Sequence, residues 1–356
     1  MSSTDISLET STDNSARADI IETRAARKNW LIGPWYDMLL VANVAWPLML
    51  FMRWNDGFEG HAGLQFWQVY FVTTPHRWIT LALVFLDRRR FQQRRTIFLG
   101  VLVSVIAACV TVRWATGALT CLLTIDYIWN AWHFAAQHQG IYRIYGRLSS
   151  ASTGWASAVE RWSLRGFLLY VTMRVAIATW TDAGLQSKFE MVDGVAALIP
   201  LFLLLRDAFR FRTIAKGQFV YLTSISLLYL GLLWAIHTHR PEIVLSLTTA
   251  SALFHALEYL SIVSWSVQRR ETAPETKPDW LKLVAAEWLV TLLSFLMILG
   301  VSGWLLDQQY KQEWLFLNVI AAFLHYAYDG LIWRRGSTSN FALTNRSVRS
   351  SLPISA

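Results

Sequence analysis

The sequence has few charged residues and almost no cysteine. Asp, Glu, Lys and Arg together make up 16% of its 356 residues, and the only cysteines are Cys109 and Cys121. Two cysteines exclude a disulfide scaffold, and we expect both to pack as small apolar side chains because each lies in an apolar run. The chain also lacks Walker, GxGxxG, GxSxG and CxxC motifs. It therefore gives no support to a nucleotide-binding, serine-hydrolase or CxxC redox enzyme.

Long hydrophobic runs take the place of these features. Hydrophobic residues make up 54% of the chain, and 19 of them are tryptophans, which is too apolar for a soluble domain of this length. A helix needs about 20 apolar residues to cross a bilayer, so we predict an all-α, polytopic membrane protein with about ten transmembrane helices. The predicted spans are residues 35–52, 66–86, 96–116, 118–139, 164–180, 190–205, 217–237, 242–265, 280–305 and 314–333.

Strongly and weakly basic loops alternate along the chain. Basic loops stay on the cytoplasmic side of a membrane. The strongly basic segments are residues 24–28, 87–95, 142–165, 206–216, 268–279 and 334–341. Both termini in the cytoplasm satisfy this pattern, and we predict an integral protein of the bacterial inner (cytoplasmic) membrane. The net charge of +8 then reflects topology and attraction to membrane lipids, and we expect no nucleic-acid partner.

The two ends of the chain are polar. Residues 1–28 are rich in Ser, Thr, Asp and Arg. Because they contain no apolar stretch, we expect no cleavable signal peptide and a disordered cytoplasmic tail. The domain prediction is therefore a tail at 1–28, a transmembrane helical domain at 29–335, and a second disordered cytoplasmic tail at 336–356.

A polar stripe runs along the predicted span at 118–139. Asp126, Asn130, His133 and Gln137 follow one another in steps of three or four residues, which places them on one face of a helix with 3.6 residues per turn. His138 comes directly after them. Such a face does not contact lipid, because ionisable groups are costly in a bilayer and tend to mark a functional site.

Three other spans carry a histidine on a polar face, namely His76, His255 and His325. Under the predicted topology, these and His133 each precede the next cytoplasmic basic residue by 9 to 14 positions. At 1.5 Å per residue, all four lie within roughly one and a half helical turns of a common plane. A single histidine in a membrane helix often makes only a packing hydrogen bond. Four at one depth predict a shared metal site.

Carboxylates accompany these histidines. Asp329 lies one turn beyond His325, and Glu258 lies one turn beyond His255. Neutral imidazoles cannot offset a divalent charge in a low dielectric, so we expect at least one carboxylate among Asp126, Glu258 and Asp329 at or next to the metal. Asp329 is the first choice as a ligand. A mixed histidine and carboxylate set favours nonheme iron, with Zn, Mn or Cu as alternatives.

The remaining polar residues have supporting roles in this prediction. Gln137, His138 and Asn130 would fix the orientation and tautomer of the ligands. Glu258 is the second choice, either as a ligand or as the base that moves a proton. Asp126 is a further candidate catalytic residue. Two residues are candidates for binding a carboxylate or oxyanion, Arg77 and Tyr142. A group of aromatic residues would suit a channel for a lipophilic substrate: Trp132, Phe134, Phe254, Tyr259, Tyr326 and Trp333.

The four histidine segments read TPHRWITLALVFLD, WHFAAQHQGIYRIY, FHALEYLSIVSW and HYAYDGLIWR. Together they resemble a pattern in uncharacterised bacterial polytopic membrane proteins, and they are similar to the histidine arrangement of Brp/Blh-type carotenoid dioxygenases. The resemblance implies an all-helical membrane enzyme whose nonheme iron is held by histidines from several spans, with His76, His133, His255 and His325 in those positions. The chain departs from that family in lacking a PHG-type opening, and it lacks the HxxHH boxes of membrane desaturases and hydroxylases.

We therefore predict a membrane-embedded, metal-dependent oxidoreductase acting on a lipid-soluble small molecule. Two alternatives stay open. A proton- or cation-coupled transporter would use the same buried His, Asp and Glu residues and would show broken helices or inverted repeats. A heme-binding membrane protein would use two of the histidines as axial ligands. Three further histidines fall at outer helix ends, where we expect them at the membrane interface: His61, His237 and His239.

Overall fold

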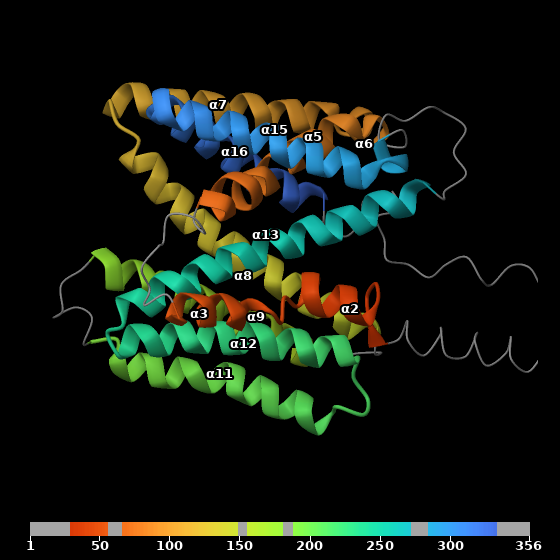
Figure 1. Cartoon of the computed structure of the whole chain (residues 1–356), viewed down its shortest axis with the longest axis vertical. Coiled ribbons are helices and arrows are strands. Elements are labelled where there is room, and N and C mark those ends of the chain that lie inside the picture. Colours follow the sequence, from red (N-terminus) through yellow and green to blue (C-terminus); the bar gives the residue numbers. More distant parts are fainter. Residues whose placement is uncertain (1–28, 56–65, 149–154, 181–187, 272–283, 333–356) are drawn as a thin grey trace, which may run out of the picture. The chain divides into compact units, whose positions relative to one another are not determined.

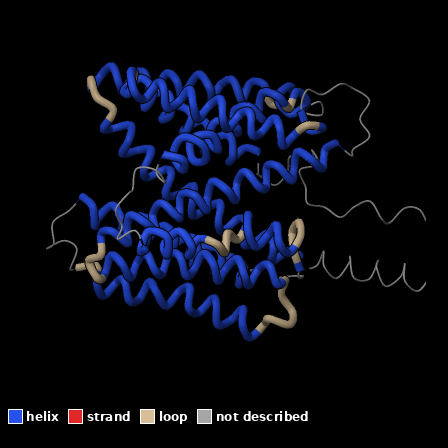
Figure 2. Tube along the Cα trace, in the orientation of Figure 1, coloured by secondary structure: helices blue, strands red, loops and turns tan. Residues whose placement is uncertain are grey.

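The computed structural model describes residues 29–55, 66–148, 155–180, 188–271 and 284–332. Within these ranges the regular elements are all helices, and no strand is present (Figure 2). The predicted all-α class is confirmed. The predicted tails lie outside the described residues, as do His61 and Trp333.

The chain forms two compact units. Unit 1 contains the described residues up to His76 together with Tyr127–Trp265, and unit 2 contains Arg77–Asp126 together with the described residues from Ser266 onward. The chain passes from one unit to the other within three helices, which are α5 (Thr74–Leu86), α8 (Thr120–Leu148) and α13 (Pro241–Glu271).

Unit 1 is built around helix α12. Apart from its parts of α5, α8 and α13, its elements are α2 (Pro34–Tyr36), the π-helix η1 (Asp37–Val41), α3 (Trp46–Asn55), the π-helix η2 (Val69–Thr73), α9 (Trp155–Trp180), α11 (Glu190–Phe209) and α12 (Lys216–His237). Helices α9, α11 and α12 pack side by side (Figure 1), and η1 packs on α12. Tyr221, Leu222, Ile225 and Leu228 of α12 are fully buried. This helix therefore supplies much of the unit's core.

Unit 2 has its own core. Apart from its parts of α5, α8 and α13, its helices are α6 (Arg88–Gln93), α7 (Arg95–Thr116), α15 (Trp288–Gln309) and α16 (Lys311–Ile332). Helix α16 packs against both α7 and α15. The Tyr328 ring meets the Phe98 ring edge to face, with centroids 5.5 Å apart, and its hydroxyl donates to the Phe98 carbonyl oxygen at 3.0 Å. A Cβ at Gly303 would lie 2.5 Å from a ring carbon of Trp314, so glycine permits the close approach of α15 and α16.

Glycine and proline separate the helices that carry the site. Gly117 ends α7 at φ +64°, a left-handed conformation that glycine adopts without strain. Pro241 begins α13, where its missing N–H removes no helical hydrogen bond. Pro75 has no N–H to donate to the carbonyl oxygen four residues earlier. The segment that ends two residues before it, Val69–Thr73, is π-helical. His76 follows this irregular segment.

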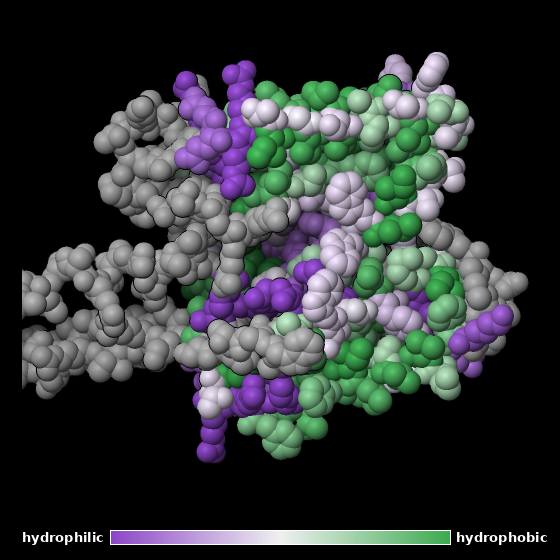
Figure 3. Space-filling view, turned by 180° about the vertical axis from the view of Figure 1, so that it is seen from behind, coloured by the Kyte–Doolittle hydropathy of each residue, from purple (hydrophilic) through white to green (hydrophobic). Residues whose placement is uncertain are grey.

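Six helical segments are long and apolar enough to cross a membrane: Phe66–Leu86, Arg95–Thr116, Lys216–His237, Pro241–Gln268, Trp288–Gln309 and Lys311–Ile332. A seventh candidate is the pair Pro34–Val41 and Trp46–Met52, which is bent by 49°. In α7 only 11% of the most apolar stretch is buried, and the same holds for α15. Figure 3 shows hydrophobic side chains over much of the surface that is not grey. Several long apolar helices thus indicate an integral membrane protein.

The other three predicted spans are also helical, but they are not among these six segments. They correspond to α8, α9 and α11. Each carries buried or half-buried polar groups within its apolar run, such as His133 in α8, Arg174 in α9 and Asp193 in α11. Charged and polar side chains lower the mean hydropathy of a helix even where they face its neighbours.

Candidate metal centre

Three of the four predicted metal-binding histidines come together in unit 1. The ring of His255 on α13 meets the ring of His76 at a centroid distance of 5.2 Å and the ring of His133 at 5.1 Å. A ring nitrogen of His76 and one of His255 lie within 4.8 Å of each other. Two nitrogens on one ion are at most about 4.2 Å apart, because each lies about 2.1 Å from the metal. The separation of these two nitrogens is thus close to what one shared ion would require.

The three rings are buried and held by aromatic neighbours. The exposed fractions of His76, His133 and His255 are 3%, 8% and 0%. Phe134 stacks on His255 with ring centroids 3.8 Å apart and planes inclined by 17°, and Tyr259 meets His76 at 6.0 Å. Aromatic contacts of this kind limit how the imidazoles can turn. Burial and these contacts thus restrict the orientations of the His76 and His255 rings.

A buried hydrogen-bond network lies beside His255. Glu258, one turn further along α13, is fully buried. Its carboxylate accepts hydrogen bonds from the Tyr221 hydroxyl at 2.7 Å and the Gln137 amide at 3.0 Å, and it lies 3.0 Å from Nδ1 of His138. A buried carboxylate is costly unless hydrogen bonds compensate for its lost hydration. Both carboxylate oxygens are engaged here, so the geometry favours a supporting role for Glu258 over direct metal ligation.

His138 has one ring nitrogen that faces this network and one that does not. Its Nδ1 lies within hydrogen-bond distance of both Glu258 and the Tyr221 hydroxyl. Donation from Nδ1 to the carboxylate leaves Nε2 as the acceptor in a neutral imidazole. Within the described part of the chain, Nε2 is buried and has no hydrogen-bond partner. The His138 ring centroid lies 5.9 Å from that of His255, and so an imidazole with an acceptor nitrogen lies beside this histidine.

Four other predicted site residues, His325, Asp329, Arg77 and Asp126, lie in unit 2 and form two pairs there. His325 shares a hydrogen bond with Thr80 at 2.7 Å, and its Nε2 lies 3.9 Å from the carboxylate of Asp329 one turn further on. Arg77 lies 3.9 Å from Asp126. The hydroxyl of Tyr326 also donates to Asp126, at 2.9 Å.

Asn130 and Tyr142 lie elsewhere on α8, in unit 1. Asn130 is half-buried, one turn before His133. The Tyr142 hydroxyl donates to Asp207 at 2.7 Å and accepts from Arg206 at 2.7 Å. Burial, followed by the negative charge of Asp207, raises the pKa of Tyr142 far above its ordinary value. This tyrosine therefore stays protonated and links α8 to α11.

Tyr221 is the site residue that the sequence analysis missed. It lies in a helix that was treated as a plain apolar span. A signal was nevertheless present, because Gln218, Tyr221 and Ser224 recur at three-residue steps and all three are buried on one face of α12. The same periodicity argument that identified the stripe on α8 would have found this second stripe.

A buried ion pair joins α9 to α11 in unit 1. Nε and Nη2 of Arg174 donate to the two carboxylate oxygens of Asp193, each at 3.0 Å. The side chains are only 2% and 3% exposed. Tyr170 donates a further hydrogen bond to Asp193. Bidentate, charge-assisted hydrogen bonds are stronger than neutral ones and fix the relative orientation of their partners, so this pair joins α9 to α11 in a defined geometry.

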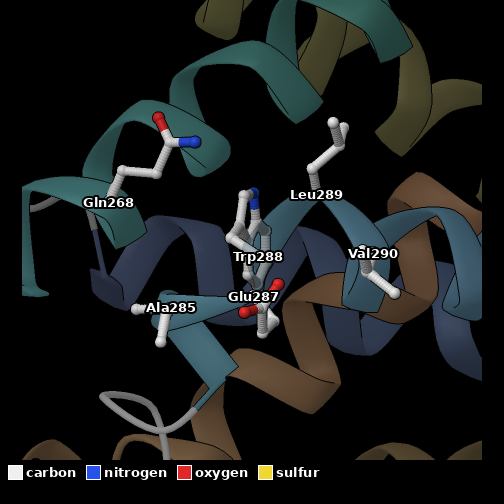
Figure 4. A pocket seen from close by; sticks show the side chains of 7 residues that line it. Gln268, Ala285, Glu287, Trp288, Leu289 and Val290 are labelled. Atoms are coloured by element: carbon white, nitrogen blue, oxygen red, sulfur yellow. The ribbon is translucent and has the colours of Figure 1, made fainter.

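A cavity of about 390 Å³ lies in unit 2 at the start of α15 (Figure 4). Its lining residues are Gln268, Ala285, Ala286, Glu287, Trp288, Leu289 and Val290. These residues include one carboxylate and no histidine. The cavity therefore lacks the ligand set found around His255.

Comparisons of the chain with protein family models, with curated proteins and with solved structures find no match. A function for this chain therefore has to be argued from its own residues.

Proposed function

We propose that this protein is a metal-dependent oxidoreductase of the bacterial cytoplasmic membrane, with nonheme iron as the metal and a lipid-soluble molecule as the substrate. The observation that carries the proposal is the contact of His255 with His76 and His133, three imidazoles brought together from three helices. Imidazole nitrogens suit iron, copper and zinc. Both cysteines lie in unit 2, on α7 and α8, so the histidine group contains no thiolate that would favour an iron–sulfur or Cu(I) site.

Glu258 supports the proposal through its charge. A divalent ion held by three neutral imidazoles keeps its full charge, which is costly in a low dielectric. The Glu258 carboxylate lies one helical turn from His255 and is held in place by Tyr221, Gln137 and His138. It would offset part of the metal's charge without occupying a coordination position. Carboxylates commonly act on metal sites in this indirect way.

The chain's own residues would orient the ligands, exclude water and move a proton. Bound iron would supply the one-electron and O₂ chemistry that side chains lack. His138 would accept a proton at Nε2, because its Nδ1 faces Glu258 and the resulting imidazolium would be stabilised by that carboxylate. Phe134 and Tyr259 would keep the histidine rings in position and keep water out.

The proposal includes about ten spans with both termini in the cytoplasm. Helices α8, α9 and α11 have 29, 26 and 20 residues, which is long enough to cross a bilayer. Pairing inside the protein, as between Arg174 and Asp193, reduces the cost of carrying charged side chains into the membrane. These two facts support counting them as spans despite their lower hydropathy.

One observation favours a second candidate, a proton- or cation-coupled transporter. The pair Pro34–Val41 and Trp46–Met52 is bent by 49°, and Asn43 at the break has φ +47°. Discontinuous helices of this kind line ion and substrate sites in many secondary transporters. In that case His138 and Glu258 would carry the transported proton.

Metal analysis of the full chain purified in detergent tests the proposal. We expect about one iron per wild-type chain, and a small fraction of this in His133→Ala and His255→Ala, because each variant removes one ligand. His239→Asn is the control, because His239 is exposed and its φ of +54° suits asparagine. His325→Ala tests the separate, sequence-based prediction that His325 also binds the metal.

Background iron in the wild type, or equal metal in His133→Ala and His239→Asn, would contradict the metal site. An optical spectrum of the same samples tests for heme, which would show a Soret band. A metal-free wild type in proteoliposomes that moves protons, and loses this activity in Glu258→Gln, would support the transporter instead.

A further inference from the structure

Arg165 on α9 donates a hydrogen bond to Gln139 at 3.1 Å, one turn before Arg143 on α8. Arg161 and Arg165 are four residues apart and so share one face of α9. The positive charges of Arg161 and of Arg143, on α8, oppose that of Arg165. Like charges at short range repel, and partial burial strengthens this repulsion because less water screens them. An arrangement of this kind favours a bound anion.

The nearby carboxylates are paired with another arginine. Glu160, next to Arg161 in sequence, accepts from Arg206 at 2.9 Å. Asp207 also pairs with Arg206. In the part of the chain that the structure describes, neither Arg161 nor Arg165 pairs with a carboxylate, and the Nε atom of each is buried without a hydrogen-bond partner. The positive charges of Arg161 and Arg165 are therefore available to an anionic ligand.

Arg165 is held in place by neutral groups. Its guanidinium carbon lies 4.9 Å from the ring centroid of Trp132 and 5.4 Å from that of Trp162, both within the roughly 6 Å range of a cation–π contact. Nη2 donates to the Gln139 side-chain oxygen at 3.1 Å. These contacts orient the guanidinium and leave its charge intact. The two tryptophans are 42% and 56% exposed, so the group lies at the protein surface.

We propose that Arg161 and Arg165 bind a phosphate group, carried either by an anionic lipid headgroup or by a soluble phosphate compound. A guanidinium matches phosphate oxygens with two parallel N–H donors, and a phosphate anion would relieve the repulsion between these two arginines. Exposed tryptophans are typical of the headgroup level of a bilayer, where Trp162 would border the glycerol region of a lipid.

Lipid binding to the purified full chain, followed by native mass spectrometry, tests this site. The double variant Arg161→Gln/Arg165→Gln is compared with Arg210→Gln/Arg212→Gln, which removes the same charge from an exposed part of unit 1. The probes are phosphatidylglycerol, phosphatidylcholine and inorganic phosphate. We expect the first double variant to weaken phosphatidylglycerol binding at least about tenfold, and the control less than about twofold, because only the first removes fixed phosphate contacts.

Equal phosphatidylglycerol and phosphate binding in the two double variants would overturn the proposal. Saturable binding of inorganic phosphate that is lost only in Arg161→Gln/Arg165→Gln, without preference for phosphatidylglycerol over phosphatidylcholine, would identify a soluble phosphate compound as the ligand. Arg165→Gln also removes the tryptophan contacts. Arg161→Gln alone removes no hydrogen bond or ring contact with the residues that the structure describes. It therefore decides the question if the double variant unfolds. It should lose several-fold affinity, and an unchanged affinity would contradict the site.

Discussion

The side-chain amide of Gln137 lies 3.0 Å from the backbone carbonyl oxygen of His255 and donates a hydrogen bond to it. The same nitrogen also donates to the Glu258 carboxylate at 3.0 Å. One residue of α8 therefore connects the backbone of a candidate metal ligand to the carboxylate one turn away. A change in the charge of Glu258 should therefore alter the metal affinity of the site, both through the Gln137 hydrogen bonds and by direct electrostatic interaction.

The first prediction concerns Glu258. Glu258→Gln keeps the size of the side chain and removes its charge. We expect the affinity for the metal to fall about tenfold, at the low end for a group that supports metal ligands indirectly. Competition with a chelator of known affinity measures this change, and thermal unfolding in detergent shows whether the fold survives.

Tyr221→Phe is the matched control for this variant. It removes one hydrogen bond to the carboxylate and leaves the charge in place. Metal affinity should fall no more than about fivefold, because a single hydrogen bond contributes only about 1 kcal/mol net, which is a factor of about five. If Glu258→Gln binds metal as tightly as the wild type, Glu258 is not the charge partner of the metal.

The polar stripe of α8 could be predicted from sequence because helical periodicity alone decides which side chains share a face. His133 and Gln137 are four residues apart, and both contact His255, one through its ring and the other through its backbone.

The partners across helices could not be predicted in this way. Tyr221 and His138 are separated by 83 positions, and periodicity within one helix carries no information about which helix it faces. Trp132 illustrates the same limit. Its position near His133 in sequence pointed to a substrate channel, whereas its ring lies against Arg165 of α9. Contacts of this kind depend on packing that a single sequence does not encode in any local pattern.

The number of spans was difficult for a related reason. A helix that carries a polar face inside a bundle has a lower mean hydropathy than one that faces lipid on all sides. Helices α7 and α15 are largely exposed and strongly apolar, so their sequences identify them directly. Helix α9 carries Arg174, and only the structure reveals that Asp193 neutralises it.

The second prediction concerns that ion pair. Asp193→Asn removes the charge that compensates the buried Arg174. We expect a loss of about 3–5 kcal/mol in stability, because an unpaired buried charge keeps its desolvation penalty. Thermal unfolding of the detergent-solubilised protein measures the loss. Replacing both residues with leucine should recover part of it, since neither charge is then buried.

The exposed pair of Arg113 and Glu313 provides the comparison for this prediction. These two side chains are 3.9 Å apart and 31% and 62% exposed. Glu313→Gln should therefore change stability by no more than about 1 kcal/mol. If Asp193→Asn and Glu313→Gln lower stability equally, burial does not increase the contribution of the Arg174–Asp193 pair to the free energy of unfolding.

The third prediction concerns topology. Arg206, Arg210 and Arg212 precede α12, whereas the turn after it carries Arg240 alone before α13 begins. Because basic loops stay in the cytoplasm, a phosphatase fused after Arg212 should be inactive, and one fused after His239 should be active.

Fusions after Ala118 and after Leu148 test α8, which falls outside the six most apolar segments. We expect activity at Ala118 and none at Leu148, because α8 is long enough to span and its basic end holds Arg143 and Arg147. A fluorescent protein that folds only in the cytoplasm should give the opposite pattern at each position. Equal activity at Ala118 and Leu148 would mean that α8 does not cross the membrane, and the count of about ten spans would then be wrong.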